Sequence, residues 1–124
     1  MANTNRNKGH AYERYAANKF RELGFTFCKT SRAASRLLDD CKVDLAFIPY
    51  NVQCKKGYPK GINYTAIFNQ MTEALTINFP PEDSIHNNPS VIMHDKGRKQ
   101  SDKLVVIQEK DFWELIEKIH GKGI

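Results

Sequence analysis

The sequence has no apolar run that approaches the roughly 20 residues a helix needs to cross a bilayer. Its first eight residues are polar and are not followed by the apolar core of a signal peptide. From these two absences we expect a cytoplasmic protein with no membrane partner.

Cysteine is scarce, since Cys28, Cys41 and Cys54 are the only three. They form no C-x-x-C pair, and an odd number suits free thiols in a reducing compartment better than a disulfide framework. A zinc site built from them and a histidine is the alternative. We favour free thiols, because two of the three fall in predicted strands, where a small core residue is expected.

The chain is also short. Its 124 residues can form one hydrophobic core but not separate domains for a substrate and a small-molecule cofactor, so we expect no such cofactor. Residues 1–7, rich in asparagine and basic residues, predict a flexible amino-terminal arm, and residues 8–124 predict a single domain. The 19 basic and 14 acidic residues give a net charge of +5, a moderate preference for polyanions.

Hydrophobic periodicity predicts helices over residues 10–23, 63–78 and 111–120. Apolar or alternating runs predict strands over residues 25–29, 43–48, 51–56, 90–94 and 103–108. Pro49-Tyr50 is short enough only for a hairpin, and residues 95–102 form the basic tip of a second hairpin. This order predicts an α/β sandwich with a central mixed sheet of about five strands flanked by helices.

Four polar side chains stand out in this apolar framework. Asp44 opens one central strand, and Gln53 and Lys55 share a face of the next, because side chains alternate along a strand. Glu13 lies on a face of the first helix that is otherwise small or apolar. Such groups have little use in a buried strand unless they meet something charged. We therefore predict that they meet a divalent cation and a DNA phosphate.

Metal-dependent phosphodiester hydrolysis needs a cation, its ligands and a group that orients water or stabilises charge. Mg²⁺ prefers hard oxygen donors and keeps several waters, so one or two carboxylates and a carbonyl suffice. Candidate ligands are the carboxylates of Asp44 and Glu13, the amide oxygen of Gln53 and the backbone carbonyl of Cys54, with Mn²⁺ as a possible substitute for Mg²⁺. Lys55 suits charge stabilisation better than general-base catalysis, because its ordinary pKa is about 10.4.

Each residue also has an ordinary structural explanation. An aspartate that opens a strand is often a turn residue, and a lysine near a strand end often extends along the surface. Glu13 can pair with a nearby basic residue, and Cys54 can simply fill the core. The joint pattern favours the nuclease hypothesis, because several such coincidences would be needed without it.

Positive charge gathers around this predicted site, with seven basic and three acidic residues between positions 28 and 60. Residues 30–36, with the sequence TSRAASR, are small, hydroxylated and basic, which suits contact with a phosphate backbone. The candidate DNA-binding residues are Lys8, Ser31, Arg32, Ser35, Arg36 and Lys56.

Together these segments resemble the PD-(D/E)XK nuclease superfamily, and within it the archaeal-type Holliday junction resolvases and similar small phage endonucleases. The resemblance covers residues 8–57 and depends on NKGHAYE at 7–13, TSRAASR at 30–36, DDCKVD at 39–44 and VQCK at 52–55. Beyond residue 58 only the order of elements agrees.

The resemblance implies a restriction-endonuclease-like sandwich and a Mg²⁺-dependent enzyme that hydrolyses phosphodiester bonds in four-way DNA junctions. In residue terms, Glu13 is the helix glutamate, Asp44 the metal-binding aspartate and Lys55 the catalytic lysine. Ser31 or Ser35 is the loop serine near the scissile strand. The implied setting is DNA recombination in a bacterial or phage-infected cell.

The resemblance also implies a homodimer, which cuts two strands symmetrically across a branched DNA. A two-fold dimer matches the geometry of a junction. A domain this small has no room for sequence-reading insertions, so we expect recognition through DNA shape and phosphates. Candidate interface residues are Tyr64, Phe68 and the terminal helix that contains Trp113.

Two departures leave alternatives open. Gln53 stands where the family motif has Asp or Glu, so a DNA-binding protein on a catalytically weakened or inactive nuclease scaffold is a second hypothesis. An endonuclease for ordinary duplex or damaged DNA is a third. Asp39 and Asp40 precede Asp44 closely and could supply the metal ligand instead; we prefer Asp44 because the apolar strand begins directly after it.

Overall fold

The computed structural model describes residues 2–57 and 61–121, with side chains from residue 8 onward. It contains six α-helices, one 3-10 helix and five strands in this described part. In chain order these are α1 (Ala2–Glu22), β1 (Lys29–Thr30), α2 (Ser31–Ala34), α3 (Arg36–Asp40), β2 (Leu45–Ala46), β3 (Asn51–Lys56), α4 (Tyr64–Asn78), α5 (Ser84–Asn87), β4 (Ser90–Asp95), η1 (Gln100–Asp102), β5 (Lys103–Ile107) and α6 (Glu109–His120).

The five strands form two sheets, so the fold is mixed α/β but the single five-stranded sheet predicted from the sequence is wrong. β1 and β2 make an antiparallel pair, and β3, β4 and β5 make a mixed sheet in that order. β2 is only two residues long. One backbone hydrogen bond, from Asp44 N–H to the Val52 carbonyl at 2.7 Å, links the segment before β2 to β3, so no ladder is assigned between the two sheets.

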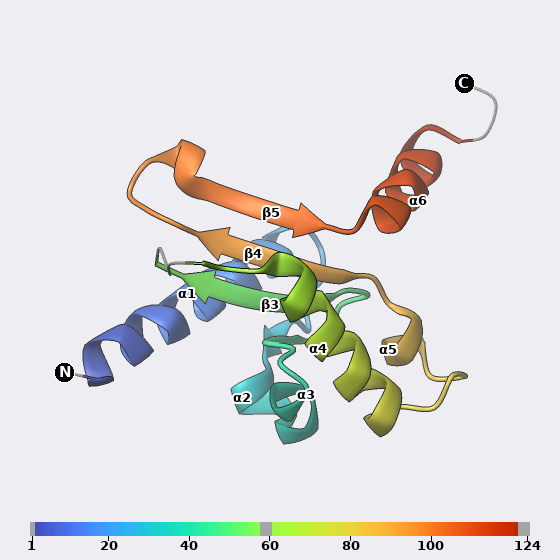
Figure 1. Cartoon of the computed structure of the whole chain (residues 1–124), viewed down its shortest axis with the longest axis horizontal. Coiled ribbons are helices and arrows are strands. Elements are labelled where there is room, and N and C mark those ends of the chain that lie inside the picture. Colours follow the sequence, from blue (N-terminus) through green and yellow to red (C-terminus); the bar gives the residue numbers. More distant parts are fainter. Residues whose placement is uncertain (1, 58–60, 122–124) are drawn as a thin grey trace.

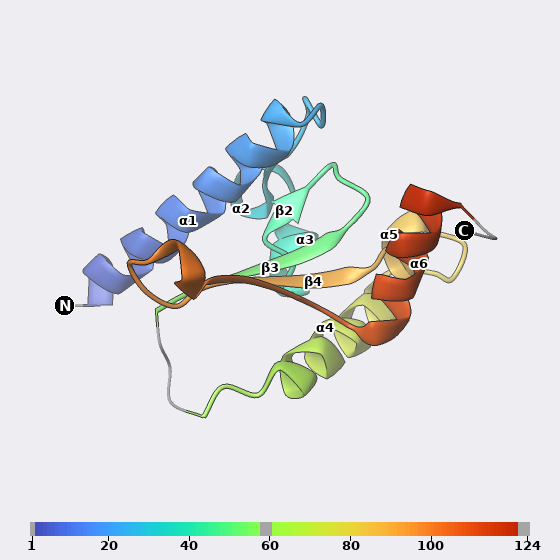
Figure 2. The ribbon, with the colours of Figure 1, turned by 90° about the horizontal axis from the view of Figure 1, so that it is seen from above.

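Helices cover both faces of the three-stranded sheet (Figure 2). β3 and β4 are parallel, with Val52 opposite Val91, and parallel neighbours need a long crossover connection. α4 supplies that crossover; its start is capped by Asn63, whose side chain accepts a hydrogen bond from Ala66 N–H. β4 and β5 form the predicted antiparallel hairpin, which is confirmed.

The core has two parts, one on each side of the molecule. Small residues of α1, Ala16 and Ala17, let that helix approach β3 closely and pack with Val52. On the other side, Met71 of α4 packs with residues around α3, including Val43. The helix predicted over residues 63–78 is therefore confirmed, and its apolar face lies in the core.

Several predicted boundaries move. α1 begins at Ala2, so its backbone continues through residues 2–7, where a flexible arm was expected; the flexibility stays a prediction, and Met1 lies outside the described residues. Residues 25–28 form turns, and only Lys29 of the predicted strand 25–29 pairs as a strand. The predicted loop 30–36 is mostly helical, because it contains α2 and the start of α3.

α6 lies at the opposite end of the molecule from the start of α1 (Figure 1). It is the predicted helix 111–120, begun two residues earlier. Much of its apolar face is exposed, including Phe112, Ile116 and Ile119. Within residues 2–57 and 61–121, the structure has no helix with the length and apolar character needed to span a bilayer.

Candidate functional site

Asp44 is the centre of the predicted site, because it joins three segments of the chain. Its backbone N–H donates to Val52, and its carbonyl accepts from Ser31 N–H at 2.8 Å. Its carboxylate oxygen Oδ2 accepts from Cys54 N–H at 2.7 Å. Lys42, with a φ of 65°, turns the chain from α3 toward this position. Asp44 is therefore held against the edge of β3 that faces away from β4.

The surroundings of Asp44 favour its neutral form. Burial, with smaller contributions from the charges of Glu13 and Asp39, raises the pKa of Asp44 to about 7, although the Cys54 N–H and the Lys55 ammonium act in the opposite direction. A carboxylate whose pKa is raised in this way gains from a cation placed beside it. A perturbed pKa of this kind is also more frequent at functional sites than elsewhere.

Glu13 reaches the same region from α1. Its side chain is 13% exposed, and its Oε2 accepts a hydrogen bond from Arg32 Nε at 3.2 Å. Glu13 therefore lies close enough to influence Asp44, and the structure brings these two predicted carboxylates together. Arg32, expected to contact DNA, instead holds Glu13 in place and partly neutralises it.

Lys55 and Gln53 lie on the face of β3 opposite α1, as predicted from strand alternation. Val52 and Cys54 pack toward α1, which places Gln53 and Lys55 on the other face. The Lys55 ammonium is close enough to lower the pKa of Asp44. Gln53 is buried, and its Oε1 has no hydrogen-bond partner among the described residues. A buried amide oxygen without a donor is costly unless a ligand reaches it.

Cys54 contributes its backbone to the site. The N–H and C=O of one strand residue point to the same side of the strand, so the Cys54 carbonyl points to the edge that Asp44 occupies. Burial, and then the charges of Asp44 and Glu13, raise the pKa of the Cys54 thiol. The thiol therefore stays protonated, and the carbonyl oxygen is the group able to face a cation.

The two candidate serines have different surroundings. Ser31 is fully buried beside Asp44, and its Oγ has no hydrogen-bond partner in the described part of the chain. Ser35 caps α3, because its Oγ accepts a hydrogen bond from Leu38 N–H at 3.3 Å. The cap gives Ser35 a structural role. Ser35 had been predicted from the sequence to contact DNA. Ser31 is the serine near Asp44.

The remaining candidate DNA-binding residues lie elsewhere. Arg36 is exposed at the start of α3. Lys56 and Lys8 line a separate cavity between α1 and the β4–β5 hairpin, which holds the buried carboxylate of Asp95. Sequence reasoning missed Asp95. The only signal was the matching position of Lys56 and Asp95 at the ends of two strands, which appears only when their parallel register is known.

Asp40 is less suited to the metal role than Asp44. Asp40 is exposed at the end of α3, whereas Asp44 is half-buried and hydrogen-bonded to β3. The charge of Asp39 raises the pKa of Asp44, but among the described residues no side-chain hydrogen bond joins Asp39 to β3. The structure therefore supports the choice of Asp44 over its two neighbours.

The oxygen donors near this edge are of the kind that Mg²⁺ prefers. Residues 2–57 and 61–121 contain no group of three or more His, Cys, Asp or Glu side chains arranged around a common metal position. Mg²⁺ needs fewer, because it keeps several waters and uses one or two carboxylates with carbonyl oxygens. The donors that could hold it are Asp44, Glu13, the Cys54 carbonyl and the unpartnered Oε1 of Gln53.

Comparison with known proteins adds no family to this description. No protein-family model, no curated protein and no solved structure matches the chain.

The raised pKa of Asp44 makes a prediction about stability. Its folded-state pKa of about 7 exceeds the ordinary aspartate pKa of 3.8, so the folded protein binds the proton more tightly than the unfolded chain does. The cost of ionising this group in the fold is absent below about pH 4, grows up to about pH 7 and then stays constant at up to roughly 4 kcal/mol. Asp44→Asn keeps an acceptor for Cys54 N–H and removes the charge.

We therefore expect Asp44→Asn to gain stability relative to the unmodified protein as pH rises from 4 to 8, in the absence of divalent cations. Urea unfolding at both pH values measures the difference. Asp40→Asn, at an exposed carboxylate, is the matched control and should show a smaller pH dependence. An equal effect of Asp44→Asn at pH 4 and pH 8 would show that the carboxylate is not desolvated.

Proposed function

We propose that this protein is a Mg²⁺-dependent endonuclease that cleaves branched DNA, with four-way junctions as its preferred substrate. The observation that supports this most is the position of Asp44. Its half-buried carboxyl group lies at the edge of β3 with Glu13 and Lys55 close by, and nothing in the fold offsets its charge with a salt bridge among the described residues. The restriction-endonuclease-like assignment is part of the same proposal.

The residues of the chain have distinct roles in this proposal. Asp44 and Glu13 supply negative charge for the cation, and the Cys54 carbonyl and Gln53 amide add neutral oxygens. When bound, Mg²⁺ offsets charge on the phosphate and lowers the pKa of water. Lys55, as an ammonium, stabilises the negative charge that grows on the phosphate oxygens during cleavage and orients the attacking water. Ser31, buried beside Asp44, has an unpartnered hydroxyl that can reach a phosphate oxygen after a small movement.

A DNA-binding protein without nuclease activity is the second candidate. Two observations favour it: Gln53 contributes no charge, and Arg32 already pairs with Glu13. Both reduce the negative charge available to a cation. Such a protein would bind DNA with a strong salt dependence and leave it uncut. Cleavage of ordinary duplex DNA is the third possibility and differs from the first only in substrate.

We expect cleavage of a labelled, immobile four-way junction in the presence of Mg²⁺ or Mn²⁺, with paired symmetric cuts, and no cleavage in EDTA. A linear duplex with the same arm sequences should stay intact. Lys55→Ala should lower the cleavage rate by about 100-fold or more, because it removes a charge that acts on the transition state. Binding of the junction should change little. Gel electrophoresis of the products and a binding titration measure the two effects.

Lys19→Ala is the matched control, since Lys19 is an exposed lysine on α1 that forms a surface ion pair with Glu22. It should cleave like the unmodified protein. Tight junction binding without cuts under either metal ion would support the DNA-binding alternative. Equal cleavage of junction and duplex would support the general endonuclease.

Symmetric cleavage needs two active sites, so we propose a homodimer formed through α6. Phe112, Leu115, Ile116 and Ile119 recur at helical spacing, and three of them are 36% exposed or more. Exposed apolar surface of this kind favours association with another chain. Of the other predicted interface residues, Phe68 is buried and Tyr64 donates or accepts a hydrogen bond with His94, so both act within the fold.

Ile119→Asp should convert the dimer to a monomer, because a carboxylate placed in an apolar interface pays a large desolvation cost. Sedimentation velocity measures the mass. Lys118→Gln lowers the net charge by the same one unit, one position earlier on the polar side of α6, and should leave the dimer intact. A monomeric unmodified protein, or a dimer unaffected by Ile119→Asp, would exclude this surface.

A further inference from the structure

A second site lies between α1 and the hairpin of β4 and β5. It is a cavity of about 600 Å³, within the range of about 300–1,000 Å³ that is usual for small-ligand pockets. Its floor is the carboxyl end of β3 and β4, and the turn that follows β4 closes one side. Nothing in the proposed cleavage reaction uses its residues.

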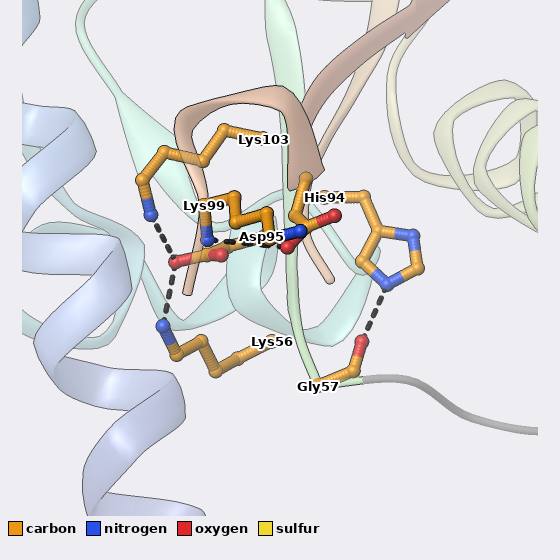
Figure 3. Close-up of polar contacts among 7 residues, drawn as sticks. Lys56, Gly57, His94, Asp95, Lys99 and Lys103 are labelled. Carbon is orange, nitrogen blue, oxygen red and sulfur yellow. Dashed lines mark hydrogen bonds and ion pairs between the residues drawn. The ribbon is translucent and has the colours of Figure 1, made fainter. Parts of the chain in front are cut away.

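A buried carboxylate organises the floor of this cavity. Asp95 is 3% exposed, and its Oδ2 accepts hydrogen bonds from Lys56 Nζ at 2.5 Å and from Lys103 Nζ at 3.0 Å (Figure 3). Burial opposes ionisation, but the two lysines outweigh it and lower the pKa of Asp95. The other oxygen, Oδ1, has no partner among the described residues. Asp95 therefore fixes two ammonium groups at the cavity wall.

Tyrosines of α1 form the opposite wall. Tyr12 and Tyr15 stack with ring centroids 6.0 Å apart and an angle of 14° between the rings. Lys56 lies over the Tyr12 ring at 5.8 Å, which adds a cation–π contact. Tyr12 is buried, whereas Tyr15 is 46% exposed. Tyr15 thus offers a flat aromatic surface at the mouth of the cavity, supported from behind by a second ring.

The turn after β4 adds positive charge on a shaped backbone. Arg98 lines the cavity, as does Lys8 of α1, and neither forms an ion pair within the described part of the chain. Asp102 accepts a hydrogen bond from Lys99 N–H and closes the turn. A side chain at Gly97 would meet the Asp102 carboxylate at 2.5 Å, so the close approach there requires glycine.

Basic residues therefore outnumber acidic ones at this cavity by five to one. Lys56 and Lys103 compensate Asp95, whereas Lys8 and Arg98 form no ion pair within the described part of the chain. A flat aromatic surface beside such an excess of cations is the combination that binds single-stranded nucleic acid, with the base stacked on the ring and the phosphate against the cations.

We propose that this cavity binds one unpaired nucleotide of a DNA strand, with its base on Tyr15 and its phosphate against Arg98 and Lys8. Lys56 follows Cys54 by two residues on the same face of β3, so the cavity lies about 7 Å further along that strand than the Asp44 site. One DNA strand can therefore contact both. That continuity rests on the proposed nuclease function, whereas binding of the nucleotide does not.

Fluorescence anisotropy with a labelled single-stranded 12-mer, in EDTA so that no cleavage occurs, tests the proposal. A blunt duplex of the same sequence is the comparison. We expect Tyr15→Ala and Arg98→Ala each to weaken single-strand binding at least about fivefold, with a smaller effect on the duplex. Tyr15→Phe keeps the ring and should bind like the unmodified protein. Arg14→Ala removes a neighbouring exposed cation of α1 as a matched control and should change binding less than twofold.

Thermal melting establishes that the variants are folded, which is expected because both positions are exposed. Unchanged single-strand binding by Tyr15→Ala would overturn the proposal. Equal weakening of single strand and duplex would also overturn it, because that result describes a general basic surface. If deoxyadenosine monophosphate displaces the 12-mer at equally low concentrations, the ligand of this cavity is a free nucleotide and not a DNA strand. Because no metal ion is present, failure here leaves the proposed cleavage reaction untouched.

Discussion

The structure depends on the three hydrogen bonds of Asp44. They join the start of α2, the segment before β2 and the edge of β3, where no regular ladder connects the two sheets. Without them, the small sheet and helices α2 and α3 would contact β3 mainly through apolar packing, which does not specify direction. The carboxyl group that makes one of these three bonds is also the group proposed to hold a cation, so folding and the proposed chemistry constrain Asp44 together.

Two aspartates, the half-buried Asp44 and the buried Asp95, have opposite surroundings. Asp95 is paired with Lys56 and Lys103, and its pKa is lowered. Asp44 receives one backbone N–H, lies near Glu13, and its pKa is raised. The charge of Asp95 is thus compensated by two lysines, whereas Asp44 is a carboxylate that a bound cation would stabilise. This contrast is the physical basis for assigning metal binding to Asp44 and positioning of lysines to Asp95.

The sequence predicted the fold where periodicity is strong and failed where contacts are few. The long apolar stripes of α4 and α6 and the alternating runs of β3, β4 and β5 were identified nearly at their observed bounds. The short strands β1 and β2 and the helices in residues 31–40 were not, because elements of two to five residues are too short to show a periodic pattern. At the site, the pattern brought Asp44, Glu13 and Lys55 together, but the pairing of Arg32 with Glu13 requires the positions of α1 and α2 in space.

Metal binding at Asp44 is the central claim, and Mn²⁺ binding measured by electron paramagnetic resonance tests it most directly. At pH 8, where Asp44 is ionised, we predict one Mn²⁺ ion per chain, displaced by Mg²⁺ and lost in Asp44→Asn but retained in Asp40→Asn. The affinity for Mn²⁺ should also fall as pH decreases below about 7, because protons then compete for the Asp44 carboxylate. Mn²⁺ binding that is unaffected by Asp44→Asn would contradict the account. So would the absence of binding to the unmodified protein at Mn²⁺ concentrations on the order of 10⁻³ M, where weak sites fill.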